Sequence, residues 1–143
     1  MTSRQSRHDT IYHLVTESDF QAENDGYIPA LYEQDGFIHC TAEPDTLLAV
    51  ANDYFSAAAE PVLVLAIDLR RVKAEVKFEP PAPIPGGGVS HLQEGLLFPH
   101  IYGPLNLDAV TGVGRLGQMK GQFIWPDDFV CLAEYKSNQT AAE

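Results

Sequence analysis

Residues 62–69 have the sequence VLVLAIDL, a nearly unbroken apolar run that begins after Pro61 and ends before the Arg70-Arg71 pair. The run has the length of a single strand, and its lack of polar alternation is typical of a strand that is buried on both faces. Such a strand lies inside a sheet and not at its edge. We therefore expect residues 62–69 to form the centre of the main sheet.

Other strand patterns surround this run on both sides. Residues 10–15 combine β-branched and aromatic side chains, and residues 74–78 alternate apolar and charged side chains as a half-buried strand does. Further strands are expected within 37–41, 97–105, 109–113 and 128–135. About seven short strands therefore dominate the chain.

One helix pattern is firm. Apolar side chains recur at the i, i+3, i+4, i+7 spacing of an amphipathic helix, and Pro44 suits the first helical position: Leu47, Val50, Ala51, Tyr54 and Phe55. A second, short helix is expected within 17–23. Because strands outnumber helices, we expect an α+β fold that is mostly antiparallel.

Length and charge restrict the class of protein. The chain has 143 residues, of which 45% are hydrophobic, which suits one globular domain; we place it at 10–136, with disordered tails at 1–9 and 137–143. The net charge of −11 opposes binding to nucleic acid or to an anionic membrane. Two cysteines and a polar N-terminal stretch predict a reduced, cytoplasmic protein, whose oligomeric state the sequence leaves open.

Two histidine segments stand out as a candidate site. Residues 36–41 have the sequence GFIHCT and residues 98–105 the sequence FPHIYGPL, so that His39 and His100 are each set among apolar residues. In a strand, alternation puts Phe37, His39 and Thr41 on one face and sends Cys40 into the core. By the same rule His100 and Tyr102 share a face. We expect the two segments to frame one site.

A glycine motif in the second half of the chain resembles a nucleotide-binding loop. Residues 112–117, GVGRLG, match the dinucleotide fingerprint, but Gly121 and Pro126 break the helix that this motif requires. We therefore interpret it as a glycine-kinked strand or turn. Arg115 within it remains a possible contact for an anion.

The histidines also raise the question of a metal. His13, His39 and His100 with Glu79 would supply enough zinc ligands if they converged, but no helical His pair or Cys-x-x-Cys motif supports this. We do not expect a metal.

At these segments the chain resembles the bacterial family known as domain of unknown function 952. The resemblance rests on motifs that follow one another between residue 10 and about residue 115: 11–13, 36–41, 52–55, 77–79 and 98–105. That family is thought to be distantly similar to the ADP-ribosyltransferases, which hold NAD in the cleft of a split antiparallel sheet. The resemblance thus implies an ADP-ribosyltransferase-like fold.

The resemblance also implies roles for individual residues. His13 would contact the dinucleotide, Thr41 and His39 would lie beside the nicotinamide, and Glu79 or His100 would act where positive charge develops as nicotinamide departs. Tyr102 stands on the last strands, where the transferases often have a glutamate. For the pyrophosphate, the cationic candidates are Arg115, Lys120 and the Arg70-Arg71 pair.

Two functions remain open at this point. The first is an enzyme that uses NAD or a related nucleotide as substrate and transfers or hydrolyses at the ribosyl carbon. The second is a non-catalytic domain that binds a small ligand in the same pocket, with the Pro- and Gly-rich segment 80–88 as its cover. A metal-dependent hydrolase ranks third.

Overall fold

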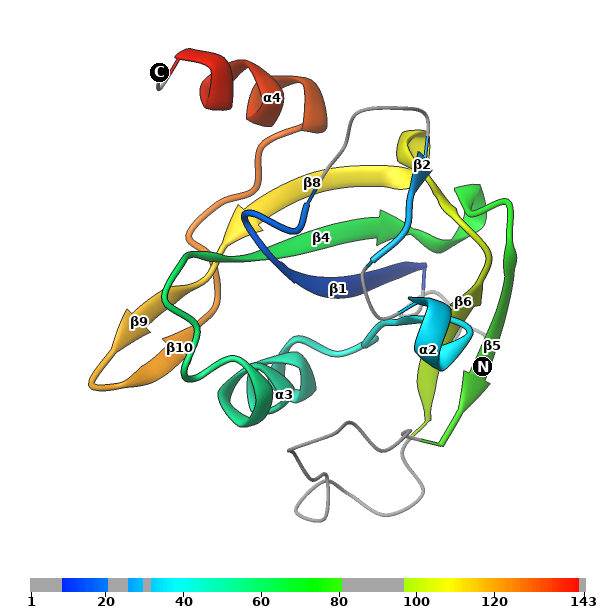
Figure 1. Cartoon of the computed structure of the whole chain (residues 1–143), viewed down its shortest axis with the longest axis horizontal. Coiled ribbons are helices and arrows are strands. Elements are labelled where there is room, and N and C mark those ends of the chain that lie inside the picture. The colour runs from blue at the N-terminus through cyan, green and yellow to red at the C-terminus, as the bar shows by residue number, and fades with distance from the viewer. Residues whose placement is uncertain (1–8, 21–25, 30–31, 81–96, 142–143) are drawn as a thin grey trace.

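The apolar run forms β4 (Val62–Asp68), the middle strand of a three-stranded antiparallel sheet (Figure 1). Its neighbours are β1 (Thr10–Thr16) and β8 (Val110–Arg115). Side chains from both faces of β4 are buried, which explains why the run lacks polar alternation. The expectation of a central strand is confirmed. The computed structural model describes residues 9–20, 26–29, 32–80 and 97–141.

A second three-stranded antiparallel sheet has the order β3-β6-β5. It consists of β3 (Ile38–His39), β6 (Phe98–Tyr102) and β5 (Glu75–Glu79). The strand expected over 37–41 is thus shorter, because the chain changes partners: Cys40 donates its N–H to the Pro99 carbonyl, and Thr41 exchanges two backbone hydrogen bonds of 2.8 Å with Tyr12 of β1. This crossing joins the two sheets.

Two apolar clusters fill the interior. The larger lies between the two sheets and includes Ile11, Ile38, Leu65 and Ile101. The smaller lies under α3 (Pro44–Tyr54), where Leu47 and other buried side chains pack together: Ala51, Val62, Val64, Leu116 and Phe123. The predicted helix is therefore confirmed, with Pro44 at its first turn.

The remaining elements are short. They are β2 (Gly26–Tyr27), α2 (Tyr32–Asp35), β7 (Leu105–Asn106), β9 (Gly117–Met119) and β10 (Gln122–Ile124), with single turns of 3-10 helix at η1 (Leu69–Arg71) and η2 (Leu107–Ala109). β2 pairs with β7, and β9 with β10. Every strand pair described is antiparallel, so the α+β class with few helices is confirmed.

The glycine motif lies in the successive strands β8 and β9 and not in a nucleotide loop followed by a helix. A Cβ atom on Gly114 would lie 2.9 Å from Cβ of Pro126 and 3.0 Å from the Phe129 ring. The glycines therefore serve the close packing of the segment 126–129 against β8.

The C-terminal part differs from the expectation. The strand expected at 128–135 is wrong: only Val130 pairs, with Val113, and α4 (Leu132–Ala141) follows. Leu132 and Tyr135 pack on the core at the i, i+3 spacing of a helix. The apolar content of residues 128–135 alone did not distinguish a helix from a strand. α4 extends through 137–141, where we expected a tail without structure.

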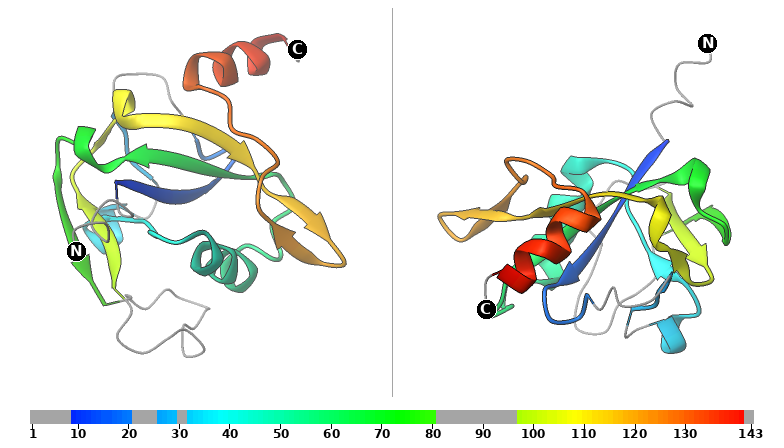
Figure 2. Two further views of the ribbon diagram at one scale, coloured as in Figure 1. Left: turned by 180° about the vertical axis from the view of Figure 1, so that it is seen from behind. Right: turned by 90° about the horizontal axis from the view of Figure 1, so that it is seen from above.

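The two longer helices lie apart. α3 packs beside β1 and β10, α4 packs beside β8, and β4 lies between them (Figure 2). In place of the start of the helix expected at 17–23, the structure has a hydrogen-bonded turn at Glu17–Asp19. Residues 21–23 lie outside the described residues, as do residues 81–88 of the Pro- and Gly-rich segment.

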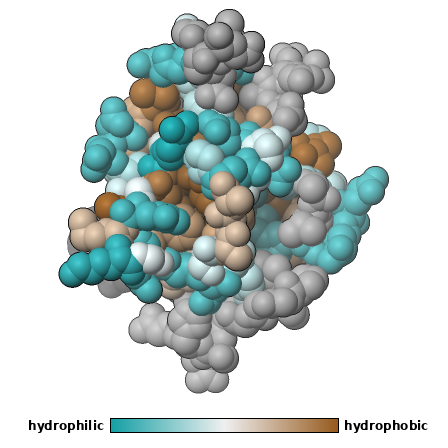
Figure 3. All heavy atoms as spheres, turned by 60° about the vertical axis from the view of Figure 1, so that its left-hand side comes forward, coloured by the Kyte–Doolittle hydropathy of each residue, from teal (hydrophilic) through white to brown (hydrophobic). Residues whose placement is uncertain are grey.

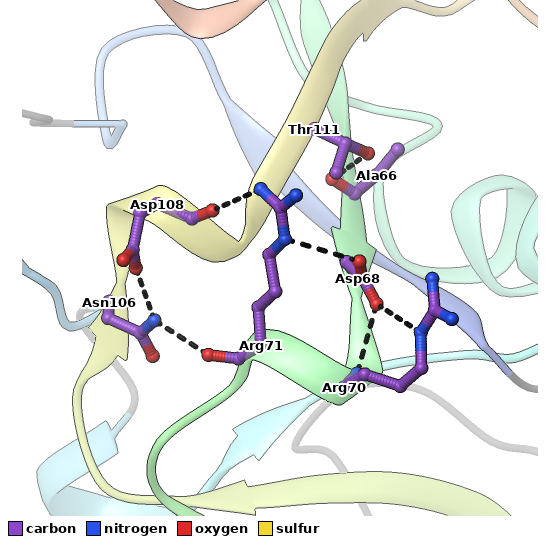
Figure 4. A network of polar contacts seen from close by, with 7 residues as sticks. All are labelled: Ala66, Asp68, Arg70, Arg71, Asn106, Asp108 and Thr111. Atoms are coloured by element: carbon purple, nitrogen blue, oxygen red, sulfur yellow. Dashed lines mark hydrogen bonds and ion pairs between the residues drawn. The ribbon is translucent and has the colours of Figure 1, made fainter.

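A polar network ties η1 to η2 (Figure 4). Asp68 accepts from the Arg70 backbone and pairs with both guanidinium groups, of Arg70 and Arg71. The Asn106 side chain donates to the Arg71 carbonyl and to Asp108. Both arginines therefore have a structural partner at the end of β4.

On the face drawn in Figure 3, hydrophilic side chains are interspersed with apolar ones. In the part of the chain that the structure describes, no helix combines the length and the apolar character needed to cross a membrane.

Candidate functional site

His39 and His100 lie directly opposite each other on β3 and β6. Opposite residues of an antiparallel pair point to the same face of the sheet, so both imidazoles leave the β3-β6-β5 sheet on one side. Their ring centroids are 5.7 Å apart. The neighbours Ile38 and Ile101 point to the other side, into the larger apolar cluster. The two histidine segments therefore do frame one site, as expected.

Each of these imidazoles has its own carboxylate. His39 Nε2 lies 2.7 Å from Oδ2 of Asp35, and His100 Nδ1 lies 2.8 Å from Oε1 of Glu79. A carboxylate that holds one ring nitrogen fixes both the orientation and the tautomer of the ring. The site thus contains two His–carboxylate pairs, Asp35–His39 and Glu79–His100.

Sequence reasoning missed Asp35. It is the last residue of α2, and Gly36 follows with φ of +84°, a left-handed conformation that ends the helix and turns the chain into β3. The Gly36 N–H donates to the Tyr32 carbonyl at 2.7 Å, as such a helix end requires. The i, i+4 spacing of Asp35 and His39 was a possible signal, but no helix was expected there.

Glu79 connects two of the predicted site residues. The Tyr102 hydroxyl donates to Oε1 of Glu79 at 2.6 Å, so Tyr102 and His100 share this oxygen. These two hydrogen bonds lower the pKa of Glu79, the Tyr102 bond most, and the same bond raises the pKa of Tyr102. Burial lowers the pKa of His100, against the opposing effect of Glu79. The group therefore favours an ionised Glu79 beside a neutral His100.

Phe37 packs over this polar group. Its ring stacks on His100 with centroids 4.0 Å apart and an interplanar angle of 18°, and it also contacts the rings of His39 and Tyr102. Lys77 lies opposite His100 on β5 and places its ammonium 5.0 Å from the centre of the Tyr102 ring. Aromatic rings, two imidazoles and one ammonium thus lie together on the sheet face.

The imidazole nitrogens that do not contact a carboxylate are the atoms of the site that can act as bases. An ionised carboxylate only accepts, so whenever such a ring is neutral the nitrogen bonded to the carboxylate holds the proton. Nδ1 of His39 and Nε2 of His100 then each keep a lone pair, and neither has a hydrogen-bond partner among the described residues. The His39 side chain is 26% exposed and that of His100 only 3%. His39 is therefore the more accessible base.

His13 lies behind the site. It is 6% exposed, its Nδ1 is 2.6 Å from the His39 carbonyl oxygen, and its Nε2 is 2.9 Å from the Tyr27 hydroxyl. Burial lowers the pKa of His13 to about 4. Its ring therefore does not share the sheet face with His39 and His100, although the family resemblance implied a ligand contact.

The other residues that were predicted to contact a ligand lie away from the site. Thr41 is buried where the chain passes from one sheet to the other. Arg115 pairs with Glu17 at 2.8 Å and ends β8 beside β9, on the opposite side of the molecule from β5 and β6 of the other sheet (Figure 1). Cys40 is buried in the larger cluster, and burial raises the pKa of its thiol. The structure thus brings together His39, Glu79, His100 and Tyr102, but not His13, Thr41 or Arg115.

A metal site would need a tighter group of ligands. In the described ranges, no three His, Cys, Asp or Glu side chains are arranged to hold a metal ion.

Comparison with known families gives a match for residues 14–113, a range that contains both His–carboxylate pairs together with Phe37, Lys77 and Tyr102. Residues 14–113 match the family model described as Protein of unknown function (DUF952). The chain belongs to this family. No curated protein matches the chain.

Two solved structures share the fold. They are protein CC0527 from Caulobacter crescentus and a double mutant of the same protein, each 24% identical to this chain with a TM-score of 0.61. Each alignment covers 80% of this chain and 93% of the other. The architecture described above is therefore also found in a crystal structure.

Proposed function

We propose that the protein is an enzyme that acts on NAD or a related nucleotide at the ribosyl carbon, in the site formed by the two His–carboxylate pairs. The observation that supports this most is that both imidazoles leave one sheet face, with ring centroids 5.7 Å apart and one nitrogen on each ring that has no hydrogen-bond partner in the described part of the chain. Such an arrangement suits proton transfer beside a developing positive charge.

The simplest reaction of this kind is hydrolysis. The bond between C1′ of the ribose and the nicotinamide nitrogen breaks, and nicotinamide leaves as a neutral molecule with the electron pair of that bond. Water forms the new bond to C1′ and gives a proton to an imidazole, for which the more exposed His39 is suited. The ionised Glu79 stabilises the positive charge that develops on the ribosyl group.

The nucleotide part of the proposal rests on the resemblance to the ADP-ribosyltransferases and on the composition of the site. Phe37 and Tyr102 offer aromatic surface for a planar ring, and Lys77 offers a cation on the same face. Three of the other basic residues considered for the pyrophosphate have structural partners, since Arg70 and Arg71 pair with Asp68 and Arg115 pairs with Glu17. The fourth, Lys120, lies in the turn between β9 and β10 and not on the face of the β3-β6-β5 sheet. Lys77 is therefore the cation that we assign to the substrate.

A second candidate is a binding domain without catalysis. It is favoured by the position of His100, whose side chain is 3% exposed and stacked against Phe37, so that little of the ring is open to a substrate. In that case His39, Tyr102 and Lys77 recognise a nucleotide and no bond is broken.

Incubation with NAD separates the two candidates. We expect the protein to release nicotinamide, and we expect His39→Ala to abolish the release because it removes the accessible base. Met119→Ala, which truncates a side chain that is 59% exposed on β9, serves as the control and keeps the wild-type rate. If nicotinamide never appears while NAD still raises the melting temperature, the binding domain is the better account.

A further inference from the structure

His13 has no part in the proposed reaction, yet it is the strand histidine with a hydrogen-bond partner at both ring nitrogens. Both of its ring nitrogens have a partner: the carbonyl oxygen of His39 at 2.6 Å and the hydroxyl of Tyr27 at 2.9 Å. Tyr27 is itself 1% exposed, and the two rings are in edge contact. Buried polar groups with every partner satisfied hold their surroundings in one arrangement.

The chemistry of the partners fixes the direction of both hydrogen bonds. A carbonyl oxygen only accepts, so Nδ1 of His13 must hold the proton and donate to His39. The ring is neutral because burial lowers its pKa to about 4, and its Nε2 therefore accepts from the Tyr27 hydroxyl. Burial also raises the pKa of Tyr27, which keeps the proton on that hydroxyl. Both nitrogens are thus used, and neither is left for a ligand.

The His39 carbonyl is a sensitive place for such a bond. β3 contains only Ile38 and His39, and β6 pairs with it on one side. Directly after it the chain changes to a different sheet at Thr41. A strand of two residues between a helix end and a sheet change has few restraints of its own, so a buried hydrogen bond to its carbonyl limits how the His39 backbone can rotate.

We infer that His13 is a positioning residue: together with Tyr27 it holds the backbone of His39, and thereby the His39 ring against Asp35, and it does not contact the substrate. The inference rests on the proposed function, since it assigns His13 a role in that site. It departs from the ligand contact that the sequence resemblance implied for this residue.

The ¹⁵N chemical shifts of the imidazole nitrogens in the wild-type protein test whether Nδ1 of His13 donates to the His39 carbonyl. At about pH 8, where imidazoles are ordinarily neutral, His13 must show its proton on Nδ1. A proton on Nε2 instead would exclude donation to the His39 carbonyl and overturn the inference.

Two matched variants test whether this hydrogen bond holds the His39 ring against Asp35. An asparagine amide nitrogen takes the place of Nδ1, and a glutamine amide nitrogen takes the place of Nε2. His13→Asn should therefore keep His39 in the single tautomer with its proton on Nε2, whereas His13→Gln should let His39 exchange between both tautomers. The same His39 spectrum in both variants would overturn the inference; if neither variant folds, the wild-type spectrum decides.

Kinetics add a readout that a merely stabilising residue would not move. With NAD as the probe, His13→Gln should lower kcat for nicotinamide release by about 10- to 100-fold with KM unchanged. The separate variant His13→Asn should keep most of the wild-type kcat. A rise of KM in both variants would instead indicate a ligand contact and contradict the inference. If the wild type releases no nicotinamide, the proposed reaction fails, and the tautomers of His13 and His39 still decide whether His13 positions His39.

Discussion

At the scale of single residues, the three strand histidines have different surroundings and therefore different chemistry. His39 is partly exposed beside Asp35, His100 is buried beside Glu79, and His13 is buried between a carbonyl and a phenol. The sequence could indicate that all three were strand residues, because strand periodicity is local. It could not indicate which partner each one meets, because Asp35, Glu79 and Tyr27 come from other elements.

The buried His13 predicts a pH dependence of stability. Its pKa is about 4 in the folded protein, against an ordinary value of 6.5, so the unfolded chain binds a proton that the folded protein does not between these two values. The contribution is fully present above pH 6.5 and is lost as the pH falls towards 4, with a total of about 3 kcal/mol. Urea unfolding at pH 7, 5.5 and 4.5 measures it.

His13→Asn is the control for this titration, since asparagine does not bind the proton. His100, whose pKa burial also lowers, remains in both proteins and cancels in the comparison. The variant should therefore lose less stability between pH 7 and 4.5 than the wild type does. An equal loss in both would show that His13 is not held neutral by burial.

At the scale of elements, the glycines of β8 matter through packing. Alanine at 114 places a methyl group within 3.0 Å of both Pro126 and the Phe129 ring. We expect Gly114→Ala to lower the free energy of unfolding by about 1–3 kcal/mol, as overpacking does. Thermal unfolding followed by circular dichroism measures the effect.

Gly26→Ala is the matched control, because a Cβ there meets its nearest neighbour, the Leu105 carbonyl oxygen, at an ordinary 3.6 Å. It should change the melting temperature little. Equal changes of the melting temperature in the two variants would mean that Gly114 is not needed for the close packing of residues 126–129 against β8.

Local sequence patterns predict some of the helices and strands but not others. β4, α3 and β1 follow from their composition and periodicity, because each buries a surface that its own sequence marks. The partner change after His39 and the helix α4 depend on tertiary contacts, with Tyr12 and with the larger apolar cluster, that no local window contains. For this reason Thr41 was expected beside His39 and is instead buried at the sheet crossing.

At the scale of the whole molecule, the site depends on the arrangement of the two sheets. β3 links them: its Ile38 side chain enters the apolar cluster between the sheets, and its His39 side chain lies on the far face with His100 of β6. Lys77 of β5 is the cation that we assign to the substrate on this face. The fold thus presents acid, base and aromatic groups on one face of a small sheet.

The measurement that tests this account most directly is the rate of nicotinamide release from NAD by the wild type and by Glu79→Gln. Glutamine keeps the size of Glu79 but lacks its charge, so the release should slow by about 10²–10³-fold, while Asp128→Asn, which neutralises an exposed carboxylate, keeps the wild-type rate. Equal rates for the wild type and Glu79→Gln, or no release by the wild type, would contradict it.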